Sequence, residues 1–301
     1  MSICYKLPIY FIFVFAIRVI LNTIIANVKN MDNSTQTPIR LIDYLEQLQA
    51  KGKLTFISTE LPKILNVTED TVKKYLQRLK AKKKVFQIRR EFWVIVPPEY
   101  YARGVIPMTW FVDDLMKFLK KDYYIALHSA AQLLGAAHQQ PMEFCLMIKK
   151  TPMRKIRNNK LALKFVVKKD WSEDDIIQKQ TEAGYINVSS PELTALDLMF
   201  YSYSAGGKNM VLTIISELIE TIKPGKLYQT AKRYKHIPTV QRLGFMIDQY
   251  LGNEKISNAL KKHLDEVNPK IVPFSVKHPI EGFEVNPKWH VIPNLELESD
   301  I

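Results

Sequence analysis

The strongest chemical signal in the sequence is a run of basic side chains at residues 73–90. This segment holds nine Lys or Arg residues and no Asp or Glu. Lysine and arginine neutralise the phosphates of a nucleic acid backbone, so such a run favours binding that weakens as salt rises. Val72, Leu76 and Leu79 recur at helical spacing, and we add Tyr75 to this apolar stripe. The pattern predicts a helix that packs on one face and meets DNA with the other.

The predicted DNA contacts share the outer face of this helix and the turn after the next strand. Thr71, Lys74 and Arg78 lie three and four positions apart, so their side chains point the same way. A helix in the major groove reads base edges, while lysine and arginine hold phosphates. The alternative is a solvated helix face, which leaves the missing acidic residues without a reason. The complete predicted set is Thr71, Lys73, Lys74, Gln77, Arg78, Lys80, Arg89 and Arg90.

A second basic run covers residues 149–169, again with nine Lys or Arg and no acidic residue. It could extend a DNA footprint or meet an acidic protein. A solvated edge of a strand–loop–strand unit explains it equally well. The candidate surface consists of Lys149, Lys150, Arg154, Lys155 and Arg157.

Residues with the spacing of a catalytic or metal site are scarce. None of the six histidines has metal-ligand spacing with a cysteine or a carboxylate, and we interpret His128 and His138 as structural. The sequence has no phosphate-binding glycine loop that ends in Lys-Ser or Lys-Thr, and no nucleophile elbow. The acidic segment "WSEDD" suits the start of a helix better than a metal site. We therefore predict no catalytic residue, no metal, no cofactor and no enzymatic activity.

Three helical patterns and a hairpin must position the first basic run. Apolar residues recur at helical spacing over residues 38–50. A second helix restarts in "ISTELPKIL" with Ser58 or Thr59 as its cap, and Thr68 caps the third. Two strand patterns, "VFQI" and "FWVIV", then form a hairpin. This order predicts a winged helix-turn-helix domain over residues 31–100.

We predict a second domain over residues 101–301, which is mixed α/β and mainly helical. The pattern of residues 109–136 is typical of two helices with a break near residue 121. The apolar runs "EFCLMIKK" and "LALKFVVKK" are typical of strands. "SSPELTALDLMFY" begins a helix, with Ser190 as cap and Pro191 in its first turn. The predicted fold class of the whole chain is α+β. Before a strand-like tail come four more helical patterns, at residues 208–222, 226–234, 238–250 and 254–264.

Length, composition and charge bound the class of protein. The chain has 301 residues and 47% apolar content, which is enough for two domains with a buried core. A net charge of +13 indicates an acidic partner, such as nucleic acid, an anionic membrane surface or an acidic protein. Cys4 and Cys145 are far apart and predict neither a disulfide framework nor a thiolate metal site. Such sparse cysteine fits a reducing cytoplasm.

Residues 1–30 form a hydrophobic extension that admits three interpretations. Arg18 interrupts the apolar run, which a membrane anchor would need over about 20 residues. A signal peptide would have a stronger basic start and a small-residue cleavage site. We favour an extension upstream of the true start at Met31. The expected location is then the cytoplasm, and the alternative is a membrane anchor through residues 1–30.

Several segments after the predicted winged helix resemble a known family. They are, in order, "YYIALHSAAQLLGAAHQQP", "VSSPELTALDLMFY", "RLGFMID" and "KWHVIPN". This layout resembles the AbiEi family of antitoxins. We interpret no residue of these segments as an active-site residue, and we expect Asp197 to pair with a neighbouring helix. The residues considered in this way are Tyr124, His128, Ser129, Pro191, Leu196 and Asp197.

The resemblance implies a bacterial or archaeal antitoxin of a toxin–antitoxin system, of the kind involved in abortive phage infection. Its amino-terminal domain would bind inverted repeats in its own promoter and repress the operon. Its carboxy-terminal domain would neutralise a nucleotidyltransferase toxin of the AbiEii type. The chain lacks the Gly-Ser and paired-Asp pattern of that toxin, and residues 1–30 depart from the family. The alternatives are a winged-helix regulator with a ligand-sensing carboxy-terminal domain and a DNA-targeted nuclease, for which no carboxylate–lysine cluster is present.

Overall fold

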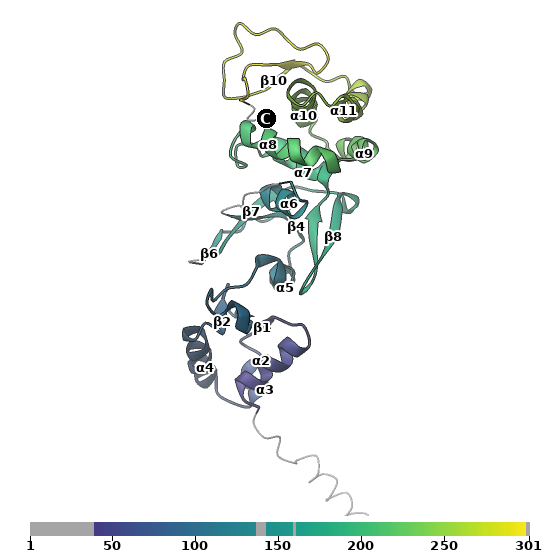
Figure 1. Ribbon diagram of the computed structural model, residues 1–301. Coiled ribbons are helices and arrows are strands. Elements are labelled where there is room, and N and C mark those ends of the chain that lie inside the picture. Colours follow the sequence, from purple (N-terminus) through teal and green to yellow (C-terminus); the bar gives the residue numbers. More distant parts are fainter. Residues whose placement is uncertain (1–38, 137–142, 159–160, 299–301) are drawn as a thin grey trace, which may run out of the picture.

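The computed structural model describes residues 39–136, 143–158 and 161–298. Figure 1 shows the amino-terminal elements at one end, a large sheet in the middle and helices α7 to α11 at the other end. The described chain mixes α-helices with several β-sheets, which confirms the predicted α+β class. The hydrophobic extension at residues 1–30 and His138 lie outside the described residues.

The amino-terminal unit alternates helices with short strands and ends in a hairpin. Its strands form an antiparallel sheet in the order β1-β3-β2. Strand β1 is absent from the prediction, because three residues are too few to show a periodicity of their own. The elements are α2 (Leu41–Ala50), β1 (Thr55–Ile57), α3 (Leu61–Leu65), α4 (Glu69–Ala81), β2 (Val85–Gln87) and β3 (Phe92–Ile95).

The helix starts of this unit test the predicted caps. Thr68 caps α4 as predicted, since its side chain accepts a hydrogen bond from the Thr71 backbone N–H. The predicted cap of α3 is wrong, because Glu60 takes that position without a side-chain hydrogen bond. Instead, Pro62 in the first turn of α3 favours the start of the helix, because its fixed φ is close to the helical value.

The three-stranded sheet is buried on both faces. Successive side chains of a strand point to opposite faces, so Trp93 packs against the helices of the amino-terminal unit while Phe92 and Val94 pack against the rest of the chain. The Phe92 and Phe118 rings lie 5.3 Å apart, between centroids. The sheet is therefore a shared wall between the amino-terminal unit and the middle of the molecule.

The middle of the molecule is a six-stranded mixed sheet in the order β6-β7-β5-β4-β9-β8. Strands β5 and β7 pair in parallel, as do β4 and β9, and the remaining pairs are antiparallel. Its elements and their flanking turns are η1 (Pro98–Tyr100), η2 (Met108–Trp110), α5 (Val112–Phe118), β4 (Tyr123–Ile125), α6 (Leu127–Leu133), β5 (Phe144–Lys149), β6 (Ile156–Asn158), β7 (Leu161–Lys168), η3 (Glu173–Asp175), β8 (Ile176–Thr181) and β9 (Gly184–Ser189).

The prediction for this region is right in part. Strands β5 and β7 and helices α5 and α6 are confirmed. The segment after the predicted helix break is wrong, because Tyr123–Ile125 forms β4, a central strand, before α6 begins. Aromatic and β-branched residues favour a strand at this point. Strands β6, β8 and β9 are absent from the prediction.

The carboxy-terminal part is a helical array closed by a two-stranded sheet. Every helix predicted here is confirmed to within a few residues. Helix α7 is buried on all sides from its second residue to its ninth, so it forms the centre of this part. The elements are α7 (Pro191–Phe200), α8 (Lys208–Leu218), η4 (Ile219–Thr221), α9 (Pro224–Tyr234), α10 (Ile237–Tyr250), α11 (Glu254–Val267), β10 (Val272–Pro273) and β11 (Val291–Ile292).

The tail packs closely against α10 and is hydrogen-bonded to it. A Cβ atom on Gly244 would overlap the buried Trp289 ring, so only glycine fits there. The Trp289 indole N–H donates to an Asp248 carboxylate oxygen at 3.0 Å. The segment after α11 is thereby packed into the main core. Across the described ranges, every helix falls short of the length and apolar character that crossing a bilayer demands.

Candidate functional site

Helix α4 presents a basic outer face. Val72 and Leu76 are buried against the other helices, which turns Lys73, Lys74 and Arg78 outward. Tyr75, which we predicted on the inner stripe, is instead 38% exposed, because it lines an open pocket that includes Leu41 and Ile42 of α2. Four side chains on this face have no ion pair or side-chain hydrogen bond within the described residues. These are Lys74, Gln77, Arg78 and Lys80.

The other predicted contacts differ in their freedom to meet a ligand. The Thr71 hydroxyl lies 2.9 Å from that of Thr68 and belongs to the helix cap. Lys73 pairs with Asp70 at 3.4 Å, but both side chains are well exposed, so the pair restrains the lysine weakly. Arg90 is exposed at the hairpin turn, and Arg89 is half-buried.

The lysines directly after α4 contact the polypeptide rather than solvent alone. The Lys83 ammonium donates to the Ala102 carbonyl at 3.3 Å. The Lys84 ammonium lies 5.7 Å from the centre of the Tyr101 ring. Both lysines thus help attach the segment that leaves the three-stranded sheet, whereas Lys74, Arg78 and Lys80 on α4 make no such contact among the described residues.

The second basic run meets acidic partners that are distant in sequence. Lys149 lies 3.6 Å from Glu173 and 3.9 Å from Asp122. Lys155 and Arg157 share Glu143, and the Arg157 guanidinium lies 3.6 Å from that carboxylate. Of the five residues predicted to form this surface, Lys150 and Arg154 remain exposed without an ionic partner among the described residues.

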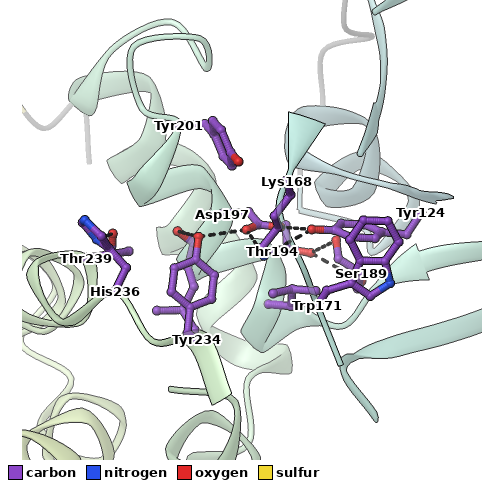
Figure 2. A network of polar contacts seen from close by, with 12 residues as sticks. Tyr124, Lys168, Trp171, Ser189, Thr194, Asp197, Tyr201, Tyr234, His236 and Thr239 are labelled. Atoms are coloured by element: carbon purple, nitrogen blue, oxygen red, sulfur yellow. Dashed lines mark hydrogen bonds and ion pairs between the residues drawn. The ribbon is translucent and has the colours of Figure 1, made fainter. Parts of the chain in front are cut away.

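A third polar group, which we call the Asp197 network, lies inside the molecule. Asp197 on α7 is fully buried. Its oxygens accept hydrogen bonds from the Tyr124 hydroxyl at 2.6 Å, the Lys168 ammonium at 2.7 Å and the Tyr234 hydroxyl at 2.9 Å. Figure 2 shows Tyr124 and Tyr234 on opposite sides of Asp197. The network joins β4, β7, α7 and α9 through one carboxylate.

The tyrosines of this network are held protonated. Burial, together with the nearby Asp197 charge, raises the pKa of Tyr124 and of Tyr234 well above the usual value. The same two causes raise the pKa of Tyr201 to about 12. Each hydroxyl therefore acts as a hydrogen-bond donor across the ordinary pH range, and the Lys168 ammonium also lies 4.5 Å from the centre of the Tyr234 ring.

A second buried acid lies beside this network. The Asp175 carboxylate accepts from the Arg233 guanidinium through two bonds, of 3.0 Å and 2.5 Å. It also accepts from the Thr230 hydroxyl at 2.7 Å. Asp175 holds the pKa of Arg233 above its ordinary value. Each of the two buried carboxylates is thus matched by one cation and by neutral donors.

An open pocket of about 660 Å³ lies over these two groups. His236 closes one side, and its Nδ1 lies 2.8 Å from the Thr239 hydroxyl oxygen. Burial, with Arg242 nearby, lowers the pKa of His236. The lining is aromatic and basic, and consists of Lys168, Lys169, Asp170, Trp171, Ser172, Asp175, Leu193, Phe200, Tyr201, Arg233, Tyr234, Lys235 and His236.

The acidic side chains near this pocket are engaged by other protein groups. In the part of the chain that the structure describes, no group of three or more His, Cys, Asp and Glu is placed to hold a metal ion. The predicted acidic segment "WSEDD" supplies Asp175 to the Arg233 pair and a hydrogen bond from the Trp171 indole N–H to Glu173 at 3.1 Å. Its acids are therefore engaged by protein groups.

Sequence reasoning finds the Asp197 network only in part. The expectation that Asp197 pairs with a neighbouring helix is confirmed by its bond from Tyr234 on α9. Lys168 and Tyr234 are absent from the predicted site residues. One signal does exist in the sequence, because an acid in the apolar segment "TALDLMF" must find a partner when it is buried. Sequence alone does not say which lysine supplies it.

A solved structure of another protein has a similar fold. In fold, the chain is similar to the crystal structure of the RV2827C protein from Mycobacterium tuberculosis, with a TM-score of 0.58 over 83% of this chain and 89% of that one. The two sequences are 14% identical, so this likeness concerns the fold alone. Comparison with curated proteins gives no match.

The family comparison covers the region of the buried network. The family model described as the AbiEi antitoxin C-terminal domain matches residues 124–249. This segment begins at Tyr124 and contains Lys168, Asp197 and Tyr234. The resemblance predicted from the sequence is confirmed by this match, in which residues 124–249 are similar to the AbiEi antitoxin C-terminal domain.

Proposed function

We propose that the protein is the antitoxin of a toxin–antitoxin system, and that it neutralises a nucleotidyltransferase toxin and represses its own operon. The AbiEi antitoxin domain at residues 124–249 carries the antitoxin part of this proposal. A toxin partner is implied by the family in general. The AbiEii type of toxin and the autorepression are inferences from the resemblance.

We further propose that residues 31–100 act as a winged helix-turn-helix domain and residues 101–301 as the antitoxin domain. The order of α2, β1, α3, α4 and the β2–β3 hairpin supports the first part. A short turn with Asn66 in the left-handed conformation, at a φ of 51°, separates α3 from α4. Such a turn sets α4 across α3 with its outer face free.

The proposed partner is double-stranded DNA with inverted repeats in the protein's own promoter. The exposed face of α4 supports this choice, because Lys74, Arg78 and Lys80 have no acidic partner among the described residues. Cations of this kind are suited to phosphates, and Gln77 to a base edge. Arg90 at the hairpin turn would contact the backbone beside the groove.

Binding to the DNA upstream of the gene tests this assignment. Replacing Lys74 and Arg78 with alanine should lower affinity by about tenfold or more and reduce the salt slope, by about one for each phosphate that loses its cation. The matched control is Lys226→Ala with Lys255→Ala, which removes the same charge from exposed positions on α9 and α11. Equal losses in the two double variants would refute a role for α4.

The test of antitoxin activity uses the full-length chain, because a truncation at residue 101 would remove the three-stranded sheet that the rest of the chain packs against. Removing the three-stranded sheet would expose Phe111 and Phe118, which pack against Phe86 and Phe92. The test is growth rescue when the neighbouring gene is co-expressed with the full chain or with its Lys74/Arg78 double variant. Both should rescue growth, while only the unmodified chain represses the promoter. A harmless neighbouring gene, or no rescue by either chain, would overturn the antitoxin role.

The second candidate function is a winged-helix regulator with a ligand-sensing carboxy-terminal domain. The aromatic and basic pocket over the Asp197 network favours it. We propose the bacterial cytoplasm as the location of either activity, because operator DNA lies there. The alternative, a membrane-anchored form, depends on residues 1–30, which lie outside the described residues.

A further inference from the structure

The pocket over the Asp197 network has the volume of a small-molecule site. Its volume of about 660 Å³ lies within the range of about 300–1,000 Å³ that is usual for ligand pockets. It opens between the end of β7, the η3 turn and the junction of α9 with α10. None of the eight residues predicted to contact DNA from α4 and the hairpin lies in it.

Aromatic side chains form much of the pocket wall. Trp171, Phe200, Tyr201 and Tyr234 all line it. Phe200 is 44% exposed at the rim although it is large and apolar. Its ring meets those of Tyr201 and His236 edge to face, with centroids 4.6 Å and 4.8 Å away. A firmly held and exposed ring of this kind offers a stacking surface to a planar group.

The rim of the pocket carries a surplus of positive charge. Lys169 and Lys235 both line it, and neither has an acidic partner among the described residues. Helix α10 begins at the same rim, directly after His236, so the positive end of its dipole adds to these charges. The acids that line the pocket are Asp175, which Arg233 neutralises, and Asp170, which is exposed.

The floor of the pocket is fixed before any ligand arrives. Lys168 is engaged with Asp197 and with two tyrosine rings, so it is unavailable as a free cation. Tyr124 lies edge to face with Trp171 at 4.9 Å, which sets the orientation of that wall. A preorganised floor lowers the entropy that binding would otherwise cost. The side chains that remain available to contact a ligand are Phe200, Lys169 and Lys235.

We propose that this pocket binds a nucleoside phosphate. The stacking surface suits a planar base, and the two rim lysines suit a di- or triphosphate, whose oxygens prefer charged donors. A simple inorganic anion would leave the aromatic wall unused, and an uncharged aromatic molecule would leave the lysines unused. The inference goes beyond the antitoxin and DNA-binding roles, since the pocket and the outer face of α4 share no residue.

The test is calorimetric titration of the full-length chain with three probes: ADP, adenosine and inorganic pyrophosphate. Phe200→Ala should weaken ADP and adenosine about tenfold and leave pyrophosphate unchanged, because it removes the stacking surface. Lys169→Ala with Lys235→Ala should weaken ADP and pyrophosphate about tenfold and leave adenosine unchanged. All three side chains reach solvent at the rim, so the fold should survive each change.

Two matched controls separate the pocket from general surface effects. Tyr203→Ala removes an aromatic ring that is 79% exposed outside the pocket, and Lys226→Ala with Lys255→Ala removes two lysines elsewhere on the surface. Neither should change ADP binding. The absence of saturable ADP binding to the unmodified chain, or equal losses in pocket and control variants, overturns the proposal. Either failure leaves promoter binding and toxin rescue to be judged by their own experiments.

Discussion

The two basic runs look alike in the sequence and differ in the folded chain. Each contains nine Lys or Arg residues and no acid. On α4, Lys74 and Arg78 point outward without acidic partners among the described residues. In the second run, Arg157 meets Glu143 and Lys168 meets a fully buried Asp197. Local charge pattern therefore predicts free surface charge only where no acid from a distant segment folds onto it.

The reason lies in the elements that carry each run. Helix α4 is an outer element, and its apolar side chains pack with the helices and strands of its own unit. Strand β7 lies between β5 and β6 in the six-stranded sheet, and Lys168 at its end pairs with the buried Asp197 of α7. The largest difference between the runs should appear when an acidic partner is removed from each.

Asp197→Ala should have the largest effect of the changes considered. It leaves Lys168 and two tyrosine hydroxyls without their acceptor inside the molecule, and breaking a buried ion pair costs about 3–5 kcal/mol. The matched change in the first run is Asp70→Ala, which removes the exposed partner of Lys73 and should cost at most about 1 kcal/mol. Urea denaturation of the two variants measures the difference, and similar midpoints would contradict the contrast.

The sequence predicts an element correctly when all the residues that define it lie within one short segment. Helix α4 with its Thr68 cap is predicted because its apolar stripe and its cap lie within one short segment. Strand β4 is missed, because its three residues, although aromatic and β-branched, lie between two helical patterns, and only pairing with β5 and β9 fixes them as a strand. The same limit applies to the site. The outer face of α4 follows from local spacing, whereas Lys168 and Asp197 meet across 29 residues.

Alkaline pH should weaken the region of the Asp197 network before it affects α4. The folded pKa of Tyr201, about 12, lies above the ordinary value of 10.0. The folded state then keeps a proton that the unfolded chain loses, so stability is full below pH 10 and falls as pH rises toward 12. The loss is roughly 1.4 kcal/mol per pH unit for each such proton. Thermal unfolding between pH 9 and pH 12 measures it.

Tyr201→Phe provides the control for this pH effect. The variant loses the hydrogen bond from the hydroxyl to the Val167 carbonyl, measured at 3.1 Å, but keeps the ring. Its stability should be slightly lower at neutral pH and should fall less steeply above pH 10. A slope as steep as that of the unmodified chain would assign the alkaline transition to other groups, of which Tyr124 and Tyr234 are the first to consider.

Alanine at Lys150 and Arg154 should change DNA affinity only slightly. These two residues are the part of the second surface that has no acidic partner within the described ranges. If the second run lies away from the DNA, their loss should lower affinity by no more than about threefold, through long-range attraction alone. Anisotropy titrations at two salt concentrations measure this. A loss as large as that of the Lys74/Arg78 double variant would extend the DNA footprint to this surface.

Glu143→Gln should give the smallest effect, and it makes the second run resemble the first. Glutamine removes the charge that Lys155 and Arg157 share, so two cations become free while the side chain keeps its size. Stability should change by less than about 1 kcal/mol, because the pairs are partly exposed. Affinity for non-specific DNA at low salt should rise by about twofold, since freed cations attract phosphates.

The control is Glu220→Gln, which removes an exposed acid that has no ionic partner among the described residues. If both variants raise the affinity equally, net charge alone accounts for the change, and the ion pairs at Glu143 have no special part in it.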